Sequence, residues 1–202
     1  MEINGIVLAG GKSLRFGNDK VSEAIGSKNL LQQVIASLRF LGGEIIVVTS
    51  NEHPISELID HPKPRILTDI LPGKGPLSGI YTGLAASTTE YNLVVASDMP
   101  FLNEALLRYQ IKISEGYDIT VPRVGKLVEP LHAIYARNCL DPMSEMMKED
   151  RLSIYQMFSR VRVRYMEAVE IERFDPEHRS LFNINTKADL AVARRLAGGL
   201  TR

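Results

Sequence analysis

The sequence predicts an α/β fold in which a mostly parallel sheet carries helices on both faces. Short runs of β-branched and apolar residues alternate with amphipathic segments from the start of the chain, as in repeated βαβ units. Most of these runs are almost continuously apolar, which suits strands that helices cover on both sides. The 202 residues are 45% hydrophobic and 24% charged, the composition of an ordinary globular chain. We therefore expect one domain spanning residues 1–202.

Six apolar runs, most of them flanked by Gly, Pro or Asp, are expected to form the strands. They are residues 5–8, 44–49, 65–68, 92–96, 119–122 and 132–135. Helical spacing of apolar residues predicts helices over residues 30–41, 80–86 and 106–113. A final helix, 186–196, follows an N-cap pattern in which Asp189 stands three positions after Thr186. The polar segment 167–179 is expected to be a surface excursion.

Charge and composition exclude several classes of protein. Lys and Arg number 24, as do Asp and Glu, so the formal net charge is zero. Proteins of duplex nucleic acid normally carry a basic excess, so we expect no nucleic acid partner. No apolar run approaches the roughly 20 residues of a membrane helix, and the N-terminus lacks the features of a signal peptide. We therefore expect a cytoplasmic protein with no membrane partner. The single Cys139 and four scattered histidines give no zinc-site spacing.

The most informative stretch is residues 8–20, LAGGKSLRFGNDK, directly after an apolar run. It is no P-loop, because the first glycine of that motif would fall on Ile6. It also lacks the G-x-G-x-x-G spacing of dinucleotide-binding folds. What remains is a glycine-rich loop whose backbone N–H groups can approach an anion, with three cations nearby, Lys12, Arg15 and Lys20. Such a loop suits a polyphosphate; the alternative is a glycine-rich turn with solvated cations.

These residues resemble a known family. The pattern L-A-G-G-x-S-x-R-[MF]-G-x-x-K is the signature of the molybdenum cofactor guanylyltransferase (MobA) family of nucleotidyltransferases, and every defined position matches. Residues 66–69, 75–79, 96–101 and 182–186 resemble later segments of the family in the same order. The chain departs from the family where relatives commonly have proline and it has Asn29.

The resemblance implies a Rossmann-like fold of nucleotidyltransferase type and a defined reaction. GMP would pass from GTP, bound with Mg²⁺, to the phosphate of molybdopterin, and pyrophosphate would leave. Since the attacking phosphate is already an anion, positioning and charge neutralisation should carry the catalysis. Transient contact with molybdoenzymes or their chaperones would follow from such a product.

The resemblance also implies roles for individual residues. The catalytic set is Arg15 on the β- and γ-phosphates, Lys20 on the α-phosphate and Asp98 on Mg²⁺. The nucleotide-binding set is Leu8, Ala9, Gly10, Gly11, Lys12, Ser13, Asp69, Gly79 and Asn183. Cations near residues 126–130, with Arg123, would face the acceptor.

Several of these residues also have a purely structural interpretation. Asp98 follows the apolar run 93–96, where ligands bind in open α/β sheets and a carboxylate can hold Mg²⁺; it could instead cap a helix before Pro100. Asp69 could be a turn residue, and Gly79 part of a plain helix-starting loop. Asn183 could face the active site, whereas Asn185 is better explained as a cap of the last helix.

Two rival functions remain open from the sequence. One is a related nucleotidyltransferase that uses CTP, or a sugar or polyol phosphate as acceptor. The other is a non-catalytic module that binds the cofactor or a nucleotide and delivers it to partner enzymes.

Overall fold

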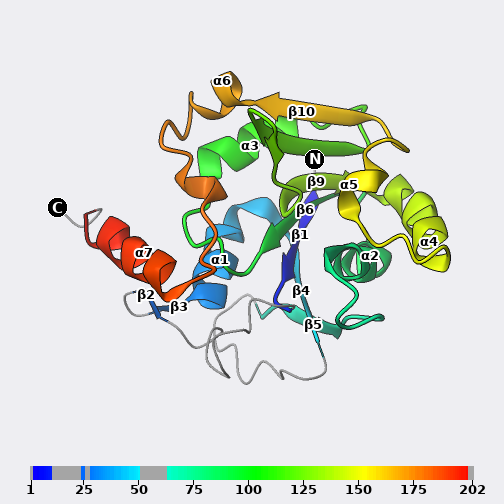
Figure 1. Cartoon of the computed structure of the whole chain (residues 1–202), viewed down its shortest axis with the longest axis horizontal. Helices are drawn as coiled ribbons and strands as arrows, with labels where there is room; N and C mark the ends of the chain where they lie inside the picture. The colour runs from blue at the N-terminus through cyan, green and yellow to red at the C-terminus, as the bar shows by residue number, and fades with distance from the viewer. Residues whose placement is uncertain (1, 11–23, 26–27, 51–62, 200–202) are drawn as a thin grey trace.

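A computed structural model describes residues 2–10, 24–25, 28–50 and 63–199, and its centre is an eight-stranded sheet (Figure 1). The strand order is β10-β7-β9-β6-β1-β4-β5, with β8 paired to β7. The strands are β1 Ile3–Leu8, β4 Gly42–Thr49, β5 Arg65–Thr68, β6 Tyr91–Ala96, β7 Ile119–Val124, β8 Leu127–Val128, β9 His132–Ala136 and β10 Val163–Glu167. A separate antiparallel pair is formed by β2 Ala24–Ile25 and β3 Lys28–Asn29. Each of the six expected runs lies in a strand of the sheet.

The sheet is mostly parallel, as the sequence predicts. Strand β1 runs parallel to β4 and β6, β4 to β5, and β7 to β10. Strand β9 is antiparallel to both of its neighbours, β6 and β7. All five residues of β9 are buried, so its apolar run reflects cover on both faces rather than strand direction. An apolar run was therefore a wrong guide to the direction of this strand.

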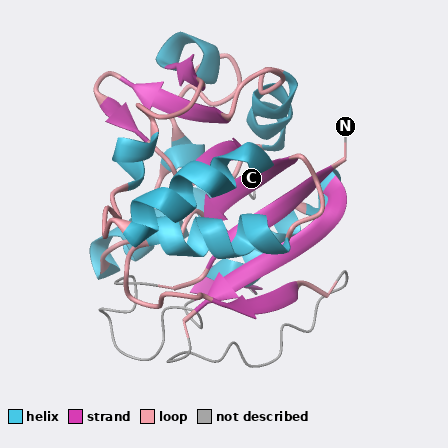
Figure 2. Ribbon diagram, turned by 90° about the vertical axis from the view of Figure 1, so that its right-hand side faces the viewer, coloured by secondary structure: helices cyan, strands magenta, loops and turns pink. Residues whose placement is uncertain are grey.

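Helices cover both faces of the sheet. On one face α2 (Pro76–Ala86), α4 (Leu140–Lys148) and α5 (Ile154–Met157) pack on strand residues such as Ile6 and Val94. On the other, α1 (Leu30–Ser37) and α3 (Glu104–Lys112) pack on residues such as Val7 and Val95. This division follows from the alternation of side chains along a strand. The view in Figure 2 looks onto the α2 side and shows helices in front of the twisted sheet.

Helix α1 begins directly after Asn29, the position at which the chain departs from the family that it resembles. The Asn29 side chain accepts a hydrogen bond from the Gln32 backbone N–H at 2.8 Å, and the Gln32 side chain accepts one from the Asn29 N–H at 3.0 Å. This reciprocal capping box satisfies two backbone donors that the helix leaves unpaired. The expected helix 30–41 is two pieces, because α1 ends at Ser37 and a 3₁₀ turn, η2 (Arg39–Leu41), follows.

The C-terminal part contains α6 (Ala168–Ile171), two short 3₁₀ turns, η3 (Arg137–Cys139) and η4 (Arg179–Leu181), and α7 (Lys187–Gly199). Thr186 and Asp189 cap α7 reciprocally, with bonds of 3.0 and 2.7 Å, as the sequence predicts. The segment 167–179 lies mostly at the surface, as expected, but two of its residues are anchored in the protein. Ile171 is fully buried, and the buried Asp175 carboxylate accepts hydrogen bonds from the Arg179 and Ser180 N–H groups.

Strand β10 and helix α4 were not expected from the sequence. No helix among the residues that the structure describes is long and apolar enough to cross a membrane.

Candidate functional site

The candidate site lies where β1, β5 and β6 end. Because these strands run in the same direction, their carboxyl ends meet at one edge of the sheet, the usual ligand side of an open α/β fold. Short backbone bonds hold the ends together: the Ser97 N–H donates to the Leu8 carbonyl at 3.0 Å, and the Asp69 N–H to the Thr49 carbonyl at 2.8 Å. The predicted residues Leu8, Asp69 and Asp98 therefore share this edge.

The end of β1 brings the first glycine of the motif close to β4. The Ala9 N–H donates to the Val48 carbonyl at 2.8 Å. A Cβ at Gly10 would lie 3.3 Å from the Ser50 backbone nitrogen, so a side chain there would crowd the neighbouring chain. The remaining motif residues predicted to bind phosphate, Gly11, Lys12, Ser13, Arg15 and Lys20, lie outside the described residues.

Asp69 is held by hydrogen bonds from its own turn and from α2. One carboxylate oxygen, Oδ1, accepts from the Ser78 hydroxyl and from the Leu71 N–H, the latter at 3.1 Å. The bond to Leu71, two residues on, is the Asx-turn interaction of a turn-forming aspartate. The other oxygen, Oδ2, lies on the side of Gly79, where an added Cβ would be 3.8 Å away.

Gly79 lies inside α2, in its first turn, rather than in the loop before it. Helix α2 spans Pro76–Ala86, so the expected helix over 80–86 is confirmed but begins four residues earlier, and the interpretation of Gly79 as part of a helix-starting loop was wrong. A Cβ at Gly79 would meet the Leu8 side chain at 3.3 Å. The missing side chain therefore lets α2 pack closely on the end of β1, beside Asp69.

Asp98 lies near a second acid, Glu129, and these two acids with the Asn183 amide are called the Asp98 cluster. The Ile184 N–H donates to the Asp98 carbonyl at 2.9 Å, and the neighbouring Asn183 side-chain amide donates to a Glu129 carboxylate oxygen at 3.1 Å. Burial raises the pKa of Glu129, and the negative charge of Asp98 raises it further. Two carboxylates and an amide from three distant parts of the chain thus come together.

Asp98 is not the cap of the following helix. Helix α3 begins at Glu104, and its N-cap is Asn103, whose side chain accepts from the Leu106 N–H at 3.0 Å. The alternative that Asp98 caps a helix is therefore wrong, and helix capping does not explain why an aspartate follows β6.

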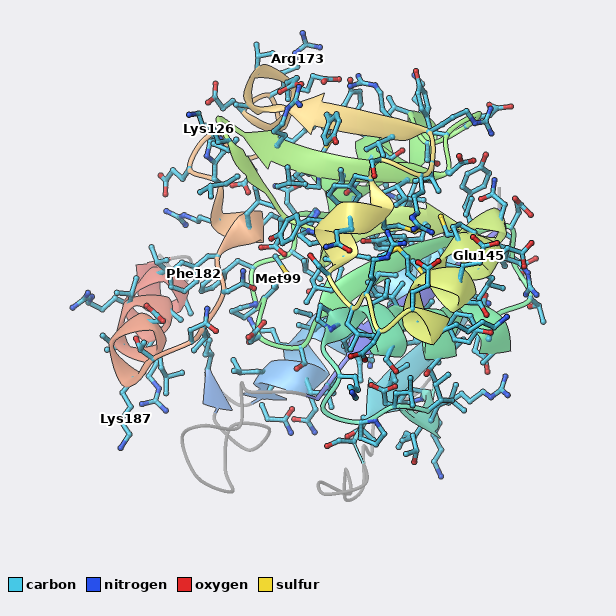
Figure 3. All side chains as sticks on the ribbon, turned by 45° about the vertical axis from the view of Figure 1, so that its right-hand side comes forward. Met99, Lys126, Glu145, Arg173, Phe182 and Lys187 are labelled. Atoms are coloured by element: carbon cyan, nitrogen blue, oxygen red, sulfur yellow. The ribbon has the colours of Figure 1, made fainter. Side chains whose placement is uncertain are left out.

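The loop after Asp98 and the segment before Asn183 lie side by side. The rings of Phe101 and Phe182 have centroids 6.2 Å apart, and Figure 3 shows Met99 and Phe182 on these neighbouring segments. Asn185 contributes its backbone N–H to the cap of α7, through Asp189, at 2.9 Å. The side chain that caps α7 is that of Thr186 rather than Asn185, so Asn185 takes part in the predicted cap only through its backbone N–H.

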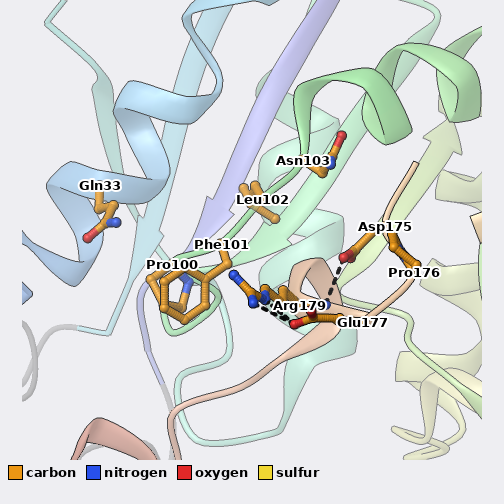
Figure 4. Close-up of a pocket in the computed structure, with 9 residues that line it drawn as sticks. All are labelled: Gln33, Pro100, Phe101, Leu102, Asn103, Asp175, Pro176, Glu177 and Arg179. Atoms are coloured by element: carbon orange, nitrogen blue, oxygen red, sulfur yellow. Dashed lines mark hydrogen bonds and ion pairs between the residues drawn. The ribbon is translucent and has the colours of Figure 1, made fainter. Parts of the chain in front are cut away.

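An open cavity of about 510 Å³ lies behind the same loop (Figure 4). Phe101, Leu102 and Asn103 form one side of it. Arg179 on the other side is paired with Glu177, with Nη2 and Oε2 2.5 Å apart. Among the residues that the structure describes, none of those predicted for the site lines this cavity.

The cations expected on the acceptor side have different surroundings. Arg123 forms a two-pronged ion pair with Glu167 and lies over the Tyr165 ring, 4.2 Å from its centroid. Lys126 is exposed at the turn between β7 and β8. The charge of Arg123 is therefore already matched within the protein.

Sequence reasoning did not single out Glu129. It lies within the segment 126–130, and its position before Pro130 gives only a turn signal. The structure identifies it because Asn183, far along the chain, donates to it.

Comparison with known proteins identifies the relatives of this chain. The model of the MobA-like NTP transferase domain family matches residues 5–164. A probable molybdenum cofactor guanylyltransferase of Pelotomaculum thermopropionicum is 33% identical, over 98% of this chain and 94% of the relative. The crystal structure of molybdopterin-guanine dinucleotide biosynthesis protein A from Archaeoglobus fulgidus superimposes with a TM-score of 0.84 at 27% identity, over 98% of this chain and 100% of the other.

A more distant structure shares the fold alone. The 2-C-methyl-D-erythritol 4-phosphate cytidylyltransferase of Thermus thermophilus has a TM-score of 0.70 at 16% identity, over 98% of this chain and 100% of the other.

Proposed function

The chain belongs to the MobA-like NTP transferase domain family, and from this premise we propose that it is a molybdenum cofactor guanylyltransferase. It transfers GMP from GTP to the phosphate of molybdopterin, releases pyrophosphate and forms the guanine dinucleotide cofactor. The observation that carries the proposal is the identity, over almost the whole of both chains, to proteins that bear this name. We further propose that residues 1–202 act as one nucleotidyltransferase domain in the cytoplasm, and that the product passes to molybdoenzymes or their chaperones by transient contact.

The loop after β1 binds the triphosphate in this proposal. The chain leaves β1 at the ligand edge through Leu8, Ala9 and Gly10. Gly10 packs closely on Ser50 and has no side chain, so its backbone N–H can approach an anion. The other members of the loop, Gly11, Lys12, Ser13, Arg15 and Lys20, add N–H groups, a hydroxyl and cations. Arg15 forks onto the β- and γ-phosphates, and Lys20 stabilises charge on the α-phosphate in the transition state.

Asp98 holds Mg²⁺ in the same proposal. The surroundings of Asp98 fit a hard cation, because its carboxylate lies near a second acid, Glu129, and near the Asn183 amide, and Mg²⁺ prefers one or two carboxylates together with phosphates and waters. When bound, the ion neutralises triphosphate oxygens next to the reacting phosphorus. Asn183 presents an amide beside this position and completes the nucleotide side of the site.

Asp69 and Gly79 form the part of the site nearest the base and ribose. Gly79 has no side chain to separate α2 from Leu8, and Asp69 fixes the turn after β5. Together they set the shape of the edge that the nucleoside enters.

The reaction is an in-line displacement at the α-phosphorus by an oxygen of the molybdopterin phosphate. A bond forms between that oxygen and phosphorus, and the bond to pyrophosphate breaks. Because the nucleophile is already an anion, no general base is needed. The residues of the site bind, orient and neutralise charge.

The test is pyrophosphate release by the purified protein with Mg²⁺ and GTP, CTP, ATP or UTP, each with and without molybdopterin. Release only with GTP and molybdopterin is the expected result. Release with CTP keeps the reaction and changes the product. No release with any nucleotide in the presence of molybdopterin overturns the proposal and returns attention to another phosphorylated acceptor or to a binding module.

A further inference from the structure

The carboxylate of Glu129 is held from two directions. Its Oε1 accepts the Leu131 N–H at 3.1 Å, and its Oε2 accepts the Asn183 side-chain amide at 3.1 Å. The backbone of Glu129 is also fixed, since its N–H donates to the Pro122 carbonyl on β7 and its carbonyl accepts from the His132 N–H on β9, both at 3.2 Å. Glu129 is therefore a rigid acceptor attached to two strands of the central sheet.

A rigid acceptor determines which way the Asn183 amide faces. Asn183 presents its NH₂ group to Glu129, so its carbonyl oxygen Oδ1, on the opposite side of the amide, is turned away from Glu129. The next residue, Ile184, is bonded through its backbone N–H to the Asp98 carbonyl. The Asn183 amide therefore has one fixed orientation, and the backbone next to it is hydrogen-bonded to Asp98.

We propose that Glu129 is a positioning residue: it fixes the Asn183 amide so that the amide oxygen remains an oxygen donor to the metal–nucleotide complex beside Asp98. The inference rests on the proposed function, because it assumes that a cation–GTP complex binds at Asp98. A negative charge at position 129 would attract a cation without involving Asn183. The hydrogen bond from Asn183 to Glu129 is what connects the glutamate to the orientation of the amide.

The sharpest variant is Glu129→Gln. Its Oε1 can still accept the Leu131 N–H, but its Nε2 then faces Asn183, which must turn its amide oxygen toward Gln and its NH₂ toward the metal–nucleotide complex. We expect the affinity for Mn²⁺ in the presence of GTP, without acceptor, to fall about tenfold, a loss comparable to one charge-assisted hydrogen bond. The readout is free Mn²⁺ measured by electron paramagnetic resonance, and thermal unfolding reports on the fold.

Two backgrounds separate positioning from charge. In Asn183→Ala, the further change Glu129→Gln should lower the Mn²⁺ affinity clearly less than it does in the wild type, because the amide through which Glu129 acts is gone and only the loss of its charge remains. In the double variant Glu129→Gln with Asn183→Asp, the Gln Nε2 can donate to the new carboxylate and every hydrogen bond is restored, so the affinity should return to within about threefold of the wild type. Glu115→Gln, an exposed acid in the turn before β7, is the matched control and should change nothing.

The inference is overturned if Glu129→Gln binds Mn²⁺ and GTP like the wild type, or if it loses the same affinity in the Asn183→Ala background. Failure of the proposed function looks different. In that case the wild type binds Mn²⁺ with GTP, the Glu129 effects persist, and molybdopterin yields no pyrophosphate.

Discussion

Two acidic positions at the same edge of the sheet are built in opposite ways. Asp69 is surrounded by donors: a serine hydroxyl from α2 and a backbone N–H of its own turn reach one of its oxygens. Asp98 lies beside a second acid, Glu129, whose pKa is raised by burial and by the Asp98 charge. Hydrogen-bond donors gather around Asp69, whereas a second carboxylate lies near Asp98.

The difference indicates two kinds of task. A carboxylate that accepts hydrogen bonds from its own turn and from a neighbouring helix, as Asp69 does, fixes the conformation of that turn before any ligand binds. Neighbouring carboxylates repel each other and gain most when a cation joins them. We therefore attribute the shape of the edge to Asp69 and the electrostatics of the reaction to the Asp98 cluster.

The largest expected effect is on turnover, at Asp98. We expect Asp98→Asn to lower turnover about 10²–10³-fold, the usual loss when one preorganised electrostatic group is removed. Asp69→Asn, which keeps an acceptor oxygen, should retain most of the activity. Pyrophosphate release under saturating GTP and molybdopterin measures both. Equal losses in the two variants would remove the distinction between the two acids.

The next effect is a pH dependence of stability in the region of Glu129. His132, three residues along the chain, is fully buried with its Nε2 3.3 Å from the Ser180 hydroxyl, and burial lowers its pKa from 6.5 to about 4. Between pH 4 and 6.5 the unfolded chain binds a proton that the folded chain does not. Stability should therefore rise across this window, by about 3 kcal/mol from His132 alone.

Urea unfolding between pH 4.5 and 7 checks this prediction. The raised pKa of Glu129 acts in the opposite direction, because it removes stability as pH rises, so His132→Gln is needed to isolate the histidine. The wild-type slope minus that of His132→Gln should be positive. A slope that His132→Gln leaves intact would assign the effect to other groups.

The sequence predicted the fold well where burial and local signals agree. The six apolar runs are strands, and the Thr186–Asp189 pattern caps α7. Strand β9 shows the limit, because a strand buried on both faces is apolar whichever way it runs. Strand β10 was missed since its sequence mixes arginine and glutamate, and ion pairs such as Arg164 with Glu170 allow these residues to lie there.

The site was predicted in part for a related reason. Residues at strand ends, such as Leu8, Asp69 and Asp98, can be found from one strand and its flank. Glu129 cannot, because its significance lies in a hydrogen bond to Asn183, 54 residues away in the sequence. Contacts of this kind depend on how the whole chain folds, and no local pattern records them.

A smaller effect is expected from the shape-fixing acid. Asp69→Ala removes the acceptor of the Ser78 hydroxyl, which is fully buried, and of the Leu71 N–H. We expect a loss of about 1–2 kcal/mol in the free energy of unfolding. Asp69→Asn should lose clearly less, since its amide oxygen can still accept. Urea unfolding at pH 7 measures both, and an Asp69→Ala protein as stable as the wild type would show that the turn does not depend on this carboxylate.

The smallest effect separates two cations on the acceptor side. Arg123 already has its charge matched by Glu167 and its plane packed on Tyr165, whereas Lys126 is exposed at the turn that follows. A charge that is paired within the protein attracts a distant anion weakly, because the field of its partner cancels most of its own. We expect Arg123→Ala to raise the KM for molybdopterin less than about twofold, and Lys126→Ala to raise it more, with a difference that shrinks as salt increases. A larger effect at Arg123 would mean that the acceptor binds this arginine in place of Glu167. The Glu167 carboxylate would then be left without its cation when the acceptor binds.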